Sequence, residues 1–279
     1  MTDTARRPGA TVPVRATTVR EGRHDERSDR VATEEPLEIR IARGADADFP
    51  LAVTMRTPGN DFELAVGLLV SEGIVRSGDD VVSVRYCSEA EQLYNVVTVQ
   101  LRGDVTIDRA HLARNLTMSS ACGVCGKASI DAIRTEACAP IAPGPVVDGD
   151  VVAALPHRLR EHQRLFESTG GLHAAGLFDA TGGLAFVRED VGRHNAVDKI
   201  VGALCMQGLL PVSDRVLVVS GRASFEIMQK AAAAGIGFVA AVGAPSSLAV
   251  QTAQELGITL CGFVRDGGFN MYAGQQRVG

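Results

Sequence analysis

The sequence lacks several features that would place it in a special class of protein. It has no tryptophan and only 4% aromatic residues, and its 28 Lys and Arg are outnumbered by 33 Asp and Glu, for a net charge of -5. No overall positive field therefore favours nucleic acid or an anionic membrane surface, so any anionic ligand has to be held locally. The first 30 residues also lack the apolar segment of a secretory signal.

Long apolar runs are missing as well. The longest nearly apolar stretch, residues 231–244, is too short to span a bilayer and is interrupted by Gly235 and Gly237. With 46% apolar residues over 279 positions, the chain can bury a core without disulfides or a structural metal. We expect a soluble, cytoplasmic protein that binds neither nucleic acid nor membrane.

Lysine is scarce, and cysteine is unevenly placed. Only three of the basic residues are lysines, Lys127, Lys199 and Lys230. Two of the six cysteines, Cys122 and Cys125, form a Cys-x-x-Cys pair. In a chain without an export signal, such a pair indicates reactive or metal-binding sulfur rather than a structural disulfide.

Turn signals and apolar periodicity divide the chain into four parts. Residues 1–30 are polar without periodicity, which predicts a disordered arm. Residues 31–115 predict a small α+β lobe, residues 116–150 hold the cysteine pair and a Pro- and Gly-rich joint, and residues 151–279 predict an α/β lobe. The elements expected before the joint are strands at 31–43 and 51–57, a helix from Asn60 or Asp61, a hairpin of 80–87 with 94–101, and a helix at 128–136.

The last part carries the clearest pattern. A helical stretch up to Phe166 that contains Pro156 is followed by a predicted hairpin of 172–179 with 183–190 and by a helix with Val197, Ile200, Val201, Leu204 and Cys205 on one face. Continuously apolar strands then alternate with helices, as in a parallel βαβαβ unit. The strands are expected at 215–220, 236–242 and 258–265, and the helices at 224–235 and 246–257.

This topology predicts a ligand-binding edge. Right-handed crossovers bring the carboxyl ends of parallel strands together, where open α/β sheets bind ligands. We therefore expect the loops 220–222, 243–247 and 265–268 to converge, with Arg222 and Arg265 available for a negative charge.

The cysteine pair allows three functional interpretations: a redox dithiol, half of a zinc site, or a sulfur relay. The predicted helix that follows and Lys127 both favour the thiolate, because positive potential stabilises the anion. Zinc would need two more ligands, for which His173 and His194 are the candidates. Cys205 and Cys261 fall on apolar faces and are expected in the core, and Cys87 and Cys138 are uninformative.

Two polar runs stand out beside the cysteines. Residues 189–195, EDVGRHN, could form a well-capped turn in which His194 or Asn195 caps the next helix, or could serve acid–base, phosphate or metal chemistry. His173 follows a Gly-Gly pair and is expected either as a core histidine or as a partner of this run.

Seven ordered segments together resemble the formate dehydrogenase accessory sulfurtransferase family, FdhD, over roughly residues 31–275. They are EEPLEIRI, MRTPGNDFELAVGLLVSEGI, SSACGVCGKASI, GGLHAAGLF, EDVGRHNAVDKIVG, SGRASFEIMQKAAAAGI and APSSLAVQTAQELGITLCGFVR. The resemblance implies a homodimer with a cytidine-deaminase-like α/β part. It also implies a carrier that takes sulfur as a persulfide from a cysteine desulfurase.

The same resemblance implies that the sulfur goes to a molybdenum or tungsten bis(molybdopterin guanine dinucleotide) cofactor destined for formate dehydrogenase. The cofactor is cargo, and no permanently bound cofactor or metal is expected. The family's persulfide cysteine falls on Cys122, with Cys125 as its partner, and the cofactor-binding stretch falls on Phe263, Val264, Arg265, Asp266, Gly267 and Gly268. Gly268 departs from the family pattern, in which Arg is frequent, so Arg222 or Arg265 has to compensate or nucleotide affinity is lower. A chaperone that only holds the cofactor is the alternative function.

Overall fold

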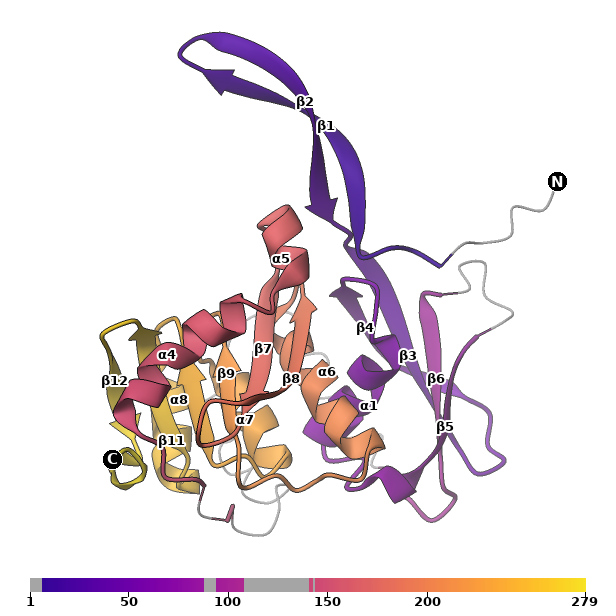
Figure 1. Ribbon diagram of the computed structural model, residues 1–279. Helices are drawn as coiled ribbons and strands as arrows, with labels where there is room; N and C mark the ends of the chain where they lie inside the picture. The colour runs from indigo at the N-terminus through magenta and orange to yellow at the C-terminus, as the bar shows by residue number, and fades with distance from the viewer. Residues whose placement is uncertain (1–6, 88–93, 108–140, 143) are drawn as a thin grey trace, which may run out of the picture.

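The computed structural model describes residues 7–87, 94–107, 141–142 and 144–279. These residues form a mixed α/β fold with a four-stranded sheet, a six-stranded sheet and a separate two-stranded hairpin (Figure 1). Helices lie between the two larger sheets, and another helix covers the outer face of the six-stranded one. None of the helices in the described part combines the length and the apolar character that a membrane span requires.

The six-stranded sheet has the order β12-β11-β10-β9-β7-β8. Strands β9, β10 and β11 are parallel to one another, which confirms the predicted βαβαβ unit, and β7 and β8 form the predicted antiparallel hairpin. The apolar, β-branched runs of this sheet suit strands that are buried on both faces. The bounds are β7 His173–Phe178, β8 Leu184–Asp190, β9 Val216–Val219, β10 Phe238–Ala241, β11 Thr259–Arg265 and β12 Gly268–Ala273.

Alternating residues of these strands face two cores. In β9, Leu217 and Val219 belong to the core shared with the inner helices, whereas Val216 and Val218 pack with α4 on the opposite face. The inner helices that follow the central strands are α6 (Arg193–Met206), α7 (Phe225–Ala233) and α8 (Ser247–Leu256), and the outer helix is α4 (Gly149–Arg160).

The four-stranded sheet and its helix make up the first lobe. Its strand order is β4-β3-β6-β5, with β3 and β6 parallel and the predicted hairpin of β5 and β6 antiparallel. The alternation of Leu37, Ile39 and Ile41 puts all three side chains into the core, beside Leu64 and Leu69 of α1. The bounds are β3 Glu35–Arg43, β4 Phe49–Arg56, α1 Asp61–Ser71, the 3-10 helix η1 Gly78–Asp80, β5 Val81–Tyr86 and β6 Val96–Leu101.

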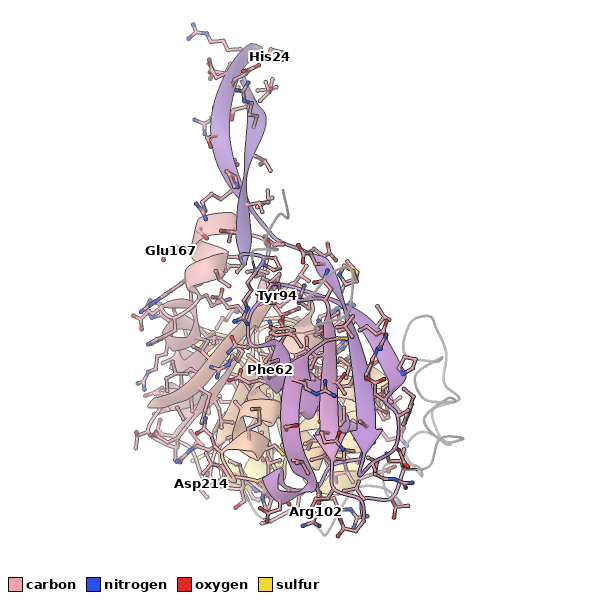
Figure 2. The ribbon with its side chains drawn as sticks, turned by 90° about the vertical axis from the view of Figure 1, so that its right-hand side faces the viewer. His24, Phe62, Tyr94, Arg102, Glu167 and Asp214 are labelled. Carbon is pink, nitrogen blue, oxygen red and sulfur yellow. The ribbon has the colours of Figure 1, made fainter. Side chains whose placement is uncertain are left out.

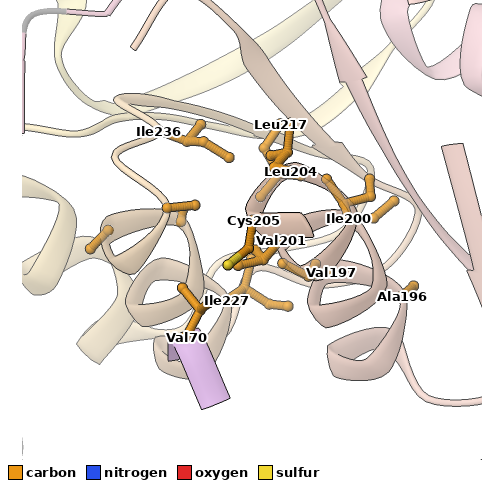
Figure 3. Packing of buried hydrophobic residues seen from close by; sticks show 14 of the residues in the cluster. Val70, Ala196, Val197, Ile200, Val201, Leu204, Cys205, Leu217, Ile227 and Ile236 are labelled. Carbon is orange, nitrogen blue, oxygen red and sulfur yellow. The ribbon is translucent and has the colours of Figure 1, made fainter. Parts of the chain in front are cut away.

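Helices α1 and α6 join the two lobes through one very close contact. A Cβ at Gly67 would lie 1.8 Å from the carbonyl oxygen of Asp198, and a Cβ at Gly202 would lie 1.8 Å from that of Glu63. Backbone therefore touches backbone, which only glycine permits. The apolar side chains of α6 are buried against both lobes, as Figure 3 shows for those around Ile227 and Leu217, so the two lobes share one core.

The N-terminal region differs from the predicted disordered arm. Strands β1 (Thr11–Arg20) and β2 (Arg23–Ala32) form an antiparallel hairpin that projects from the body (Figure 1). Its turn is Glu21-Gly22, with φ of 50° and 77°, and positive φ at both central residues suits the twist of a two-residue hairpin. His24 lies at the tip, and Glu167 of helix α5 (Arg164–Thr169) lies near the base (Figure 2).

The polar composition of the hairpin at residues 11–32 explains why its strands were not predicted from the sequence. Most of its side chains are exposed on both faces, so it shows no one-sided apolar alternation. Two strands alone are marginally stable in water, and the contact of β2 with α5 supplies tertiary support.

Two smaller differences concern the second lobe. The helical stretch up to Phe166 is two helices, α4 and α5 (Arg164–Thr169), separated by residues 161–163. Strand β12 follows β11 through the two-residue turn Asp266-Gly267, in which Gly267 has a φ of 88°. The chain closes with the 3-10 helix η2, Gln275–Arg277.

The glycine contact between α1 and α6 leads to a stability prediction. Gly202→Ala should destabilise the protein by about 3 kcal/mol, because the new methyl group meets backbone that cannot move alone. Urea unfolding measures the difference. Gly103→Ala is the matched control, since its Cβ would meet nothing closer than 3.9 Å. Equal unfolding free energies for the two variants would contradict the close contact.

Candidate functional site

The carboxyl ends of the parallel strands converge as predicted. Backbone hydrogen bonds join the loop after β9 to the loop after β10, from Gly243 N to Gly221 O at 2.9 Å and from Ala223 N to Ala244 O at 3.2 Å. The second loop also reaches β11, because Phe263 N donates to Gly243 O at 3.2 Å. These contacts hold the first two predicted loops together and against β11, along one edge of the sheet that we call the ligand edge, and the predicted loop 265–268 continues from β11.

A hollow of about 640 Å³ lies at the far end of the ligand edge, at the turn between β11 and β12. Phe263 bulges out of the strand with a φ of 52°, and its side chain is 44% exposed. Arg265 and Asp266 are exposed beside it and offer one charge of each sign. The residues that line the hollow are Phe263, Arg265, Asp266, Gly267, Gly268, Phe269 and Asn270.

The hollow contains five of the six residues expected from 263–268. Val264 is the exception, because its side chain is fully buried in the core beneath the strand and leaves only its backbone for a ligand. Arg222 is exposed in the loop after β9 and does not line the hollow. Phe269 and Asn270 were missed, although Asp266-Gly267 is a hairpin signal that predicts a following strand on the same hollow.

The predicted reactive pair, Cys122 and Cys125, lies outside the described residues, as do Lys127, Cys138 and the helix expected at 128–136. Two of the remaining cysteines behave as predicted. Cys205 and Cys261 are fully buried, and burial raises the pKa of their thiols to about 11 and about 12. Such thiols are poor nucleophiles at neutral pH.

The run 189–195 forms a buried polar junction between the lobes. Asp190 is fully buried, pairs with Lys199 at 2.6 Å and accepts a hydrogen bond from the backbone of Thr57 at 3.2 Å. Its other oxygen accepts from Asn195 Nδ2 at 2.9 Å and from Gly192 N at 2.8 Å. The carboxylate is thus saturated by structural partners and cannot serve as a free base.

Glu189 of this junction is also occupied. Glu189 accepts from the first backbone N–H groups of α5, at Leu165 and Phe166. The expectation that His194 or Asn195 caps α6 is wrong, because the helix begins at Arg193 and its N-cap is Gly192. The capped-turn interpretation nevertheless fits Glu189 and Asp190.

The two described lysines share a structural role. Lys199 Nζ donates to the carbonyl oxygen of Thr57 at 3.0 Å besides pairing with Asp190. Lys230 reaches Asp198 at 2.7 Å, and Ser71 of α1 donates to the same carboxylate at 2.7 Å. Burial raises the pKa of the Asp198 carboxyl, and the Lys230 charge opposes that shift. Each lysine therefore joins α6 to a neighbouring element.

His173 and His194 come together on the ligand edge, as their hairpin spacing suggested. His173 opens β7, and His194 Nε2 lies 3.1 Å from Ser224 Oγ at the start of α7. Burial and the Arg193 charge lower the pKa of His173, and burial, Arg193 and Lys230 lower that of His194 to about 4. Both rings are consequently neutral at pH 7. In the part of the chain that the structure covers, no group of three or more His, Cys, Asp or Glu is placed to hold a metal ion.

Comparison with known proteins gives a consistent result. The sequence model of the FdhD/NarQ family matches residues 32–279. A relative from Streptomyces avermitilis, named sulfur carrier protein FdhD, is 52% identical over 266 residues and covers 93% of this chain and 93% of its own. A relative of the same name from Sulfurisphaera tokodaii is 43% identical and covers 90% of this chain and 92% of its own.

A solved structure shows the same fold. The crystal structure of a candidate formate dehydrogenase accessory protein from Desulfotalea psychrophila superposes with a TM-score of 0.76, covering 96% of this chain and 99% of its own at 22% identity. The mixed α/β fold predicted from the sequence is confirmed, and the likeness to cytidine deaminase stays a prediction.

The Asp190–Lys199 pair predicts a large loss of stability when it is broken. Lys199→Met leaves a buried carboxylate without its cation and should cost about 3–5 kcal/mol of unfolding free energy. Arg102→Met is the control, because its pair with Asp104 is exposed and contributes at most about 1 kcal/mol. A Lys199→Met protein within about 1 kcal/mol of the wild type in urea unfolding would show that the pair is not structural.

The low pKa of His194 predicts a pH dependence of stability. Between about pH 6.5 and 4 the unfolded chain binds a proton at this residue that the folded protein does not, so stability falls as the pH is lowered through this window. His194→Asn should make the decrease in Tm between pH 7 and pH 4.5 shallower. His157→Asn, at an exposed position on α4, should leave the decrease as it is. Identical pH profiles for His194→Asn and the wild type would contradict the lowered pKa of this partly buried ring.

Proposed function

The chain belongs to the FdhD/NarQ family, and we propose on this basis that it carries sulfur for the maturation of formate dehydrogenase. The observation that supports this most strongly is the 52% identity, over nearly the whole chain, to a protein named sulfur carrier. In this proposal the protein acts as a sulfurtransferase in the cytoplasm, works as a homodimer, and meets a cysteine desulfurase and formate dehydrogenase in turn.

The first chemical step loads Cys122. Its thiolate attacks the outer sulfur of the desulfurase persulfide, the S–S bond of that persulfide breaks, and the desulfurase cysteine leaves as a thiolate. Cys122 then carries the persulfide. Lys127 and the helix predicted after it would supply the positive potential that favours the thiolate in this step.

The second step releases the sulfur. The Cys125 thiolate attacks the inner sulfur of the Cys122 persulfide, a Cys122–Cys125 disulfide forms, and hydrosulfide departs toward the metal of the cofactor. A dithiol reductant of the cell then restores both thiols, which balances the two electrons. Two residues between the cysteines allow such a disulfide to close.

The cargo in this proposal is the bis(molybdopterin guanine dinucleotide) cofactor of molybdenum or tungsten. The hollow at 263–270 suits one nucleotide end, with Arg265 for phosphate and the exposed ring of Phe263 for base stacking. Gly267 and Gly268 allow a ligand to approach the backbone closely. Arg222 lies one loop away on the same edge and suits a phosphate further along the ligand.

Mass spectrometry tests the sulfur-carrier function. The full-length protein is incubated with a cysteine desulfurase and cysteine, and its intact mass should rise by one sulfur, about 32 Da. Cys122→Ala should abolish the adduct, because it removes the accepting thiolate. Absence of the adduct on the wild-type protein would refute sulfur carriage and favour the alternative function, a chaperone that only holds the cofactor.

Cys125→Ser separates loading from release. It should load sulfur on Cys122 as the wild type does and lose most of its ability to deliver sulfur to formate dehydrogenase in a system free of added thiols. The matched control is Cys205→Ser, whose cysteine lies in the core and outside this chemistry. Full delivery by Cys125→Ser would eliminate the disulfide step.

A further inference from the structure

A cluster of polar side chains on the ligand edge has no role in the sulfur chemistry or the core. His173 opens β7, Arg193 and His194 open α6, and Ser224 precedes α7. Gly221 lies against the first two, since a Cβ there would be 3.4 Å from His173 Nδ1 and 3.7 Å from Arg193 Cδ. We call His173, Arg193, His194 and Ser224 the edge cluster.

One donor of the edge cluster is buried without an acceptor. Arg193 Nε is inaccessible to solvent and has no hydrogen-bond partner among the described residues. A buried guanidinium N–H that lacks an acceptor costs free energy, so its retention indicates an acceptor that arrives with a ligand. Guanidinium groups favour oxyanions, which accept several of their N–H groups at once.

Most charges around Arg193 are paired with one another, and none of the described carboxylates accepts from its Nε. Lys230 is neutralised by Asp198, and Asp190 is saturated by Lys199 and backbone donors. Among the described residues, Asp190 acts on His173, and Glu226 lies 3.7 Å from His194 Nε2, accepts from the Ser224 hydroxyl, faces Arg193 and is 53% exposed to solvent. Solvent weakens the field of this exposed carboxylate, and the neutral ring of His173 keeps one N–H to donate, whereas the Nε2 of His194 is engaged with Ser224 Oγ.

The edge cluster and the hollow at 263–270 lie on the same edge of one sheet. Strand β7 is three places from β11 in the order β11-β10-β9-β7, which corresponds to about 14 Å at the usual strand spacing. The two joined loops at Gly221 and Gly243 bridge this interval. A ligand that extends along the edge from the hollow would reach the edge cluster with its other end.

We propose that the edge cluster is an anion-binding subsite for the oxyanion-like metal end of the cofactor, while the hollow holds a nucleotide end. This inference rests on the proposed function, because it takes the nucleotide-bearing cofactor as the ligand. Arg193 supplies the charge, His173 supplies a neutral N–H donor, and the hydrogen-bonded pair of His194 and Ser224 forms the polar wall beside them.

Tungstate is the probe for this subsite, with titration calorimetry of the full-length protein as the measurement. The wild type should bind tungstate, and Arg193→Gln should weaken binding at least tenfold. Arg193→Lys, which keeps the charge but removes the buried Nε donor, should also bind more weakly than the wild type. Arg215→Gln is the matched control, because Arg215 precedes the opposite end of β9 and should leave affinity unchanged. Equal affinity in the wild type and both Arg193 variants would overturn the subsite.

Two further ligands distinguish the metal end from a phosphate of the nucleotide. Saturating GMP should leave tungstate binding within about threefold, because the hollow and the edge cluster are separate. Inorganic phosphate should compete with tungstate only weakly. A tenfold loss of tungstate affinity in the presence of GMP would overturn the assignment of the edge cluster to the metal end. An affinity for phosphate equal to that for tungstate would overturn it as well.

Measuring the sulfur adduct on the wild-type protein distinguishes a failure of the edge-cluster proposal from a failure of the proposed function. A protein that gains sulfur on Cys122 but does not bind tungstate refutes the edge cluster alone. A protein that binds tungstate at Arg193 but gains no sulfur refutes sulfur carriage alone.

Discussion

The backbone contact of α1 with α6 is the constraint on which the rest of the structure depends. Gly67 and Gly202 let the two helices touch without side chains between them, so the sheet of the first lobe and the sheet of the second close over one shared core. Helix α6 is buried along nearly its whole length by this arrangement. Its first turn, which carries Arg193 and His194, is thereby fixed at the ligand edge.

Buried charges specify how the lobes fit together. Apolar packing is not directional. The ion pairs of Asp190 with Lys199 and of Asp198 with Lys230, in contrast, form only when α6 lies at one position relative to β8 and α7. The guanidinium of Arg56, fully buried at the end of β4, is paired with Asp61 at the start of α1 in the same way. Arg56 bonds to several acceptors at once, which suits a guanidinium, whereas Lys199 and Lys230 each pair with one buried carboxylate, which suits a compact ammonium.

Sequence reasoning predicted the elements whose apolar period is strong and missed those built from polar residues. Continuous apolar runs predicted the parallel strands and the convergence of their loops. The alternation of apolar residues that begins at Leu37 predicted a strand of the first sheet. The exposed hairpin at residues 11–32 has no such signal beyond Glu21-Gly22. The hollow was predicted by resemblance up to Gly268, but the burial of Val264 and the approach of Arg193 to His173 depend on tertiary contacts that no local pattern encodes.

The burial of Val264 has a consequence for how tightly a ligand can bind. With this side chain held in the core, Phe263 and Arg265 on either side of it are presented by a strand whose backbone is already ordered. A ligand entering the hollow then does not have to freeze a loose loop, and the conformational entropy lost on association is confined to a few side chains. If the hollow holds the proposed cofactor, its release would accordingly be governed by the contacts that are lost and not by refolding of the site.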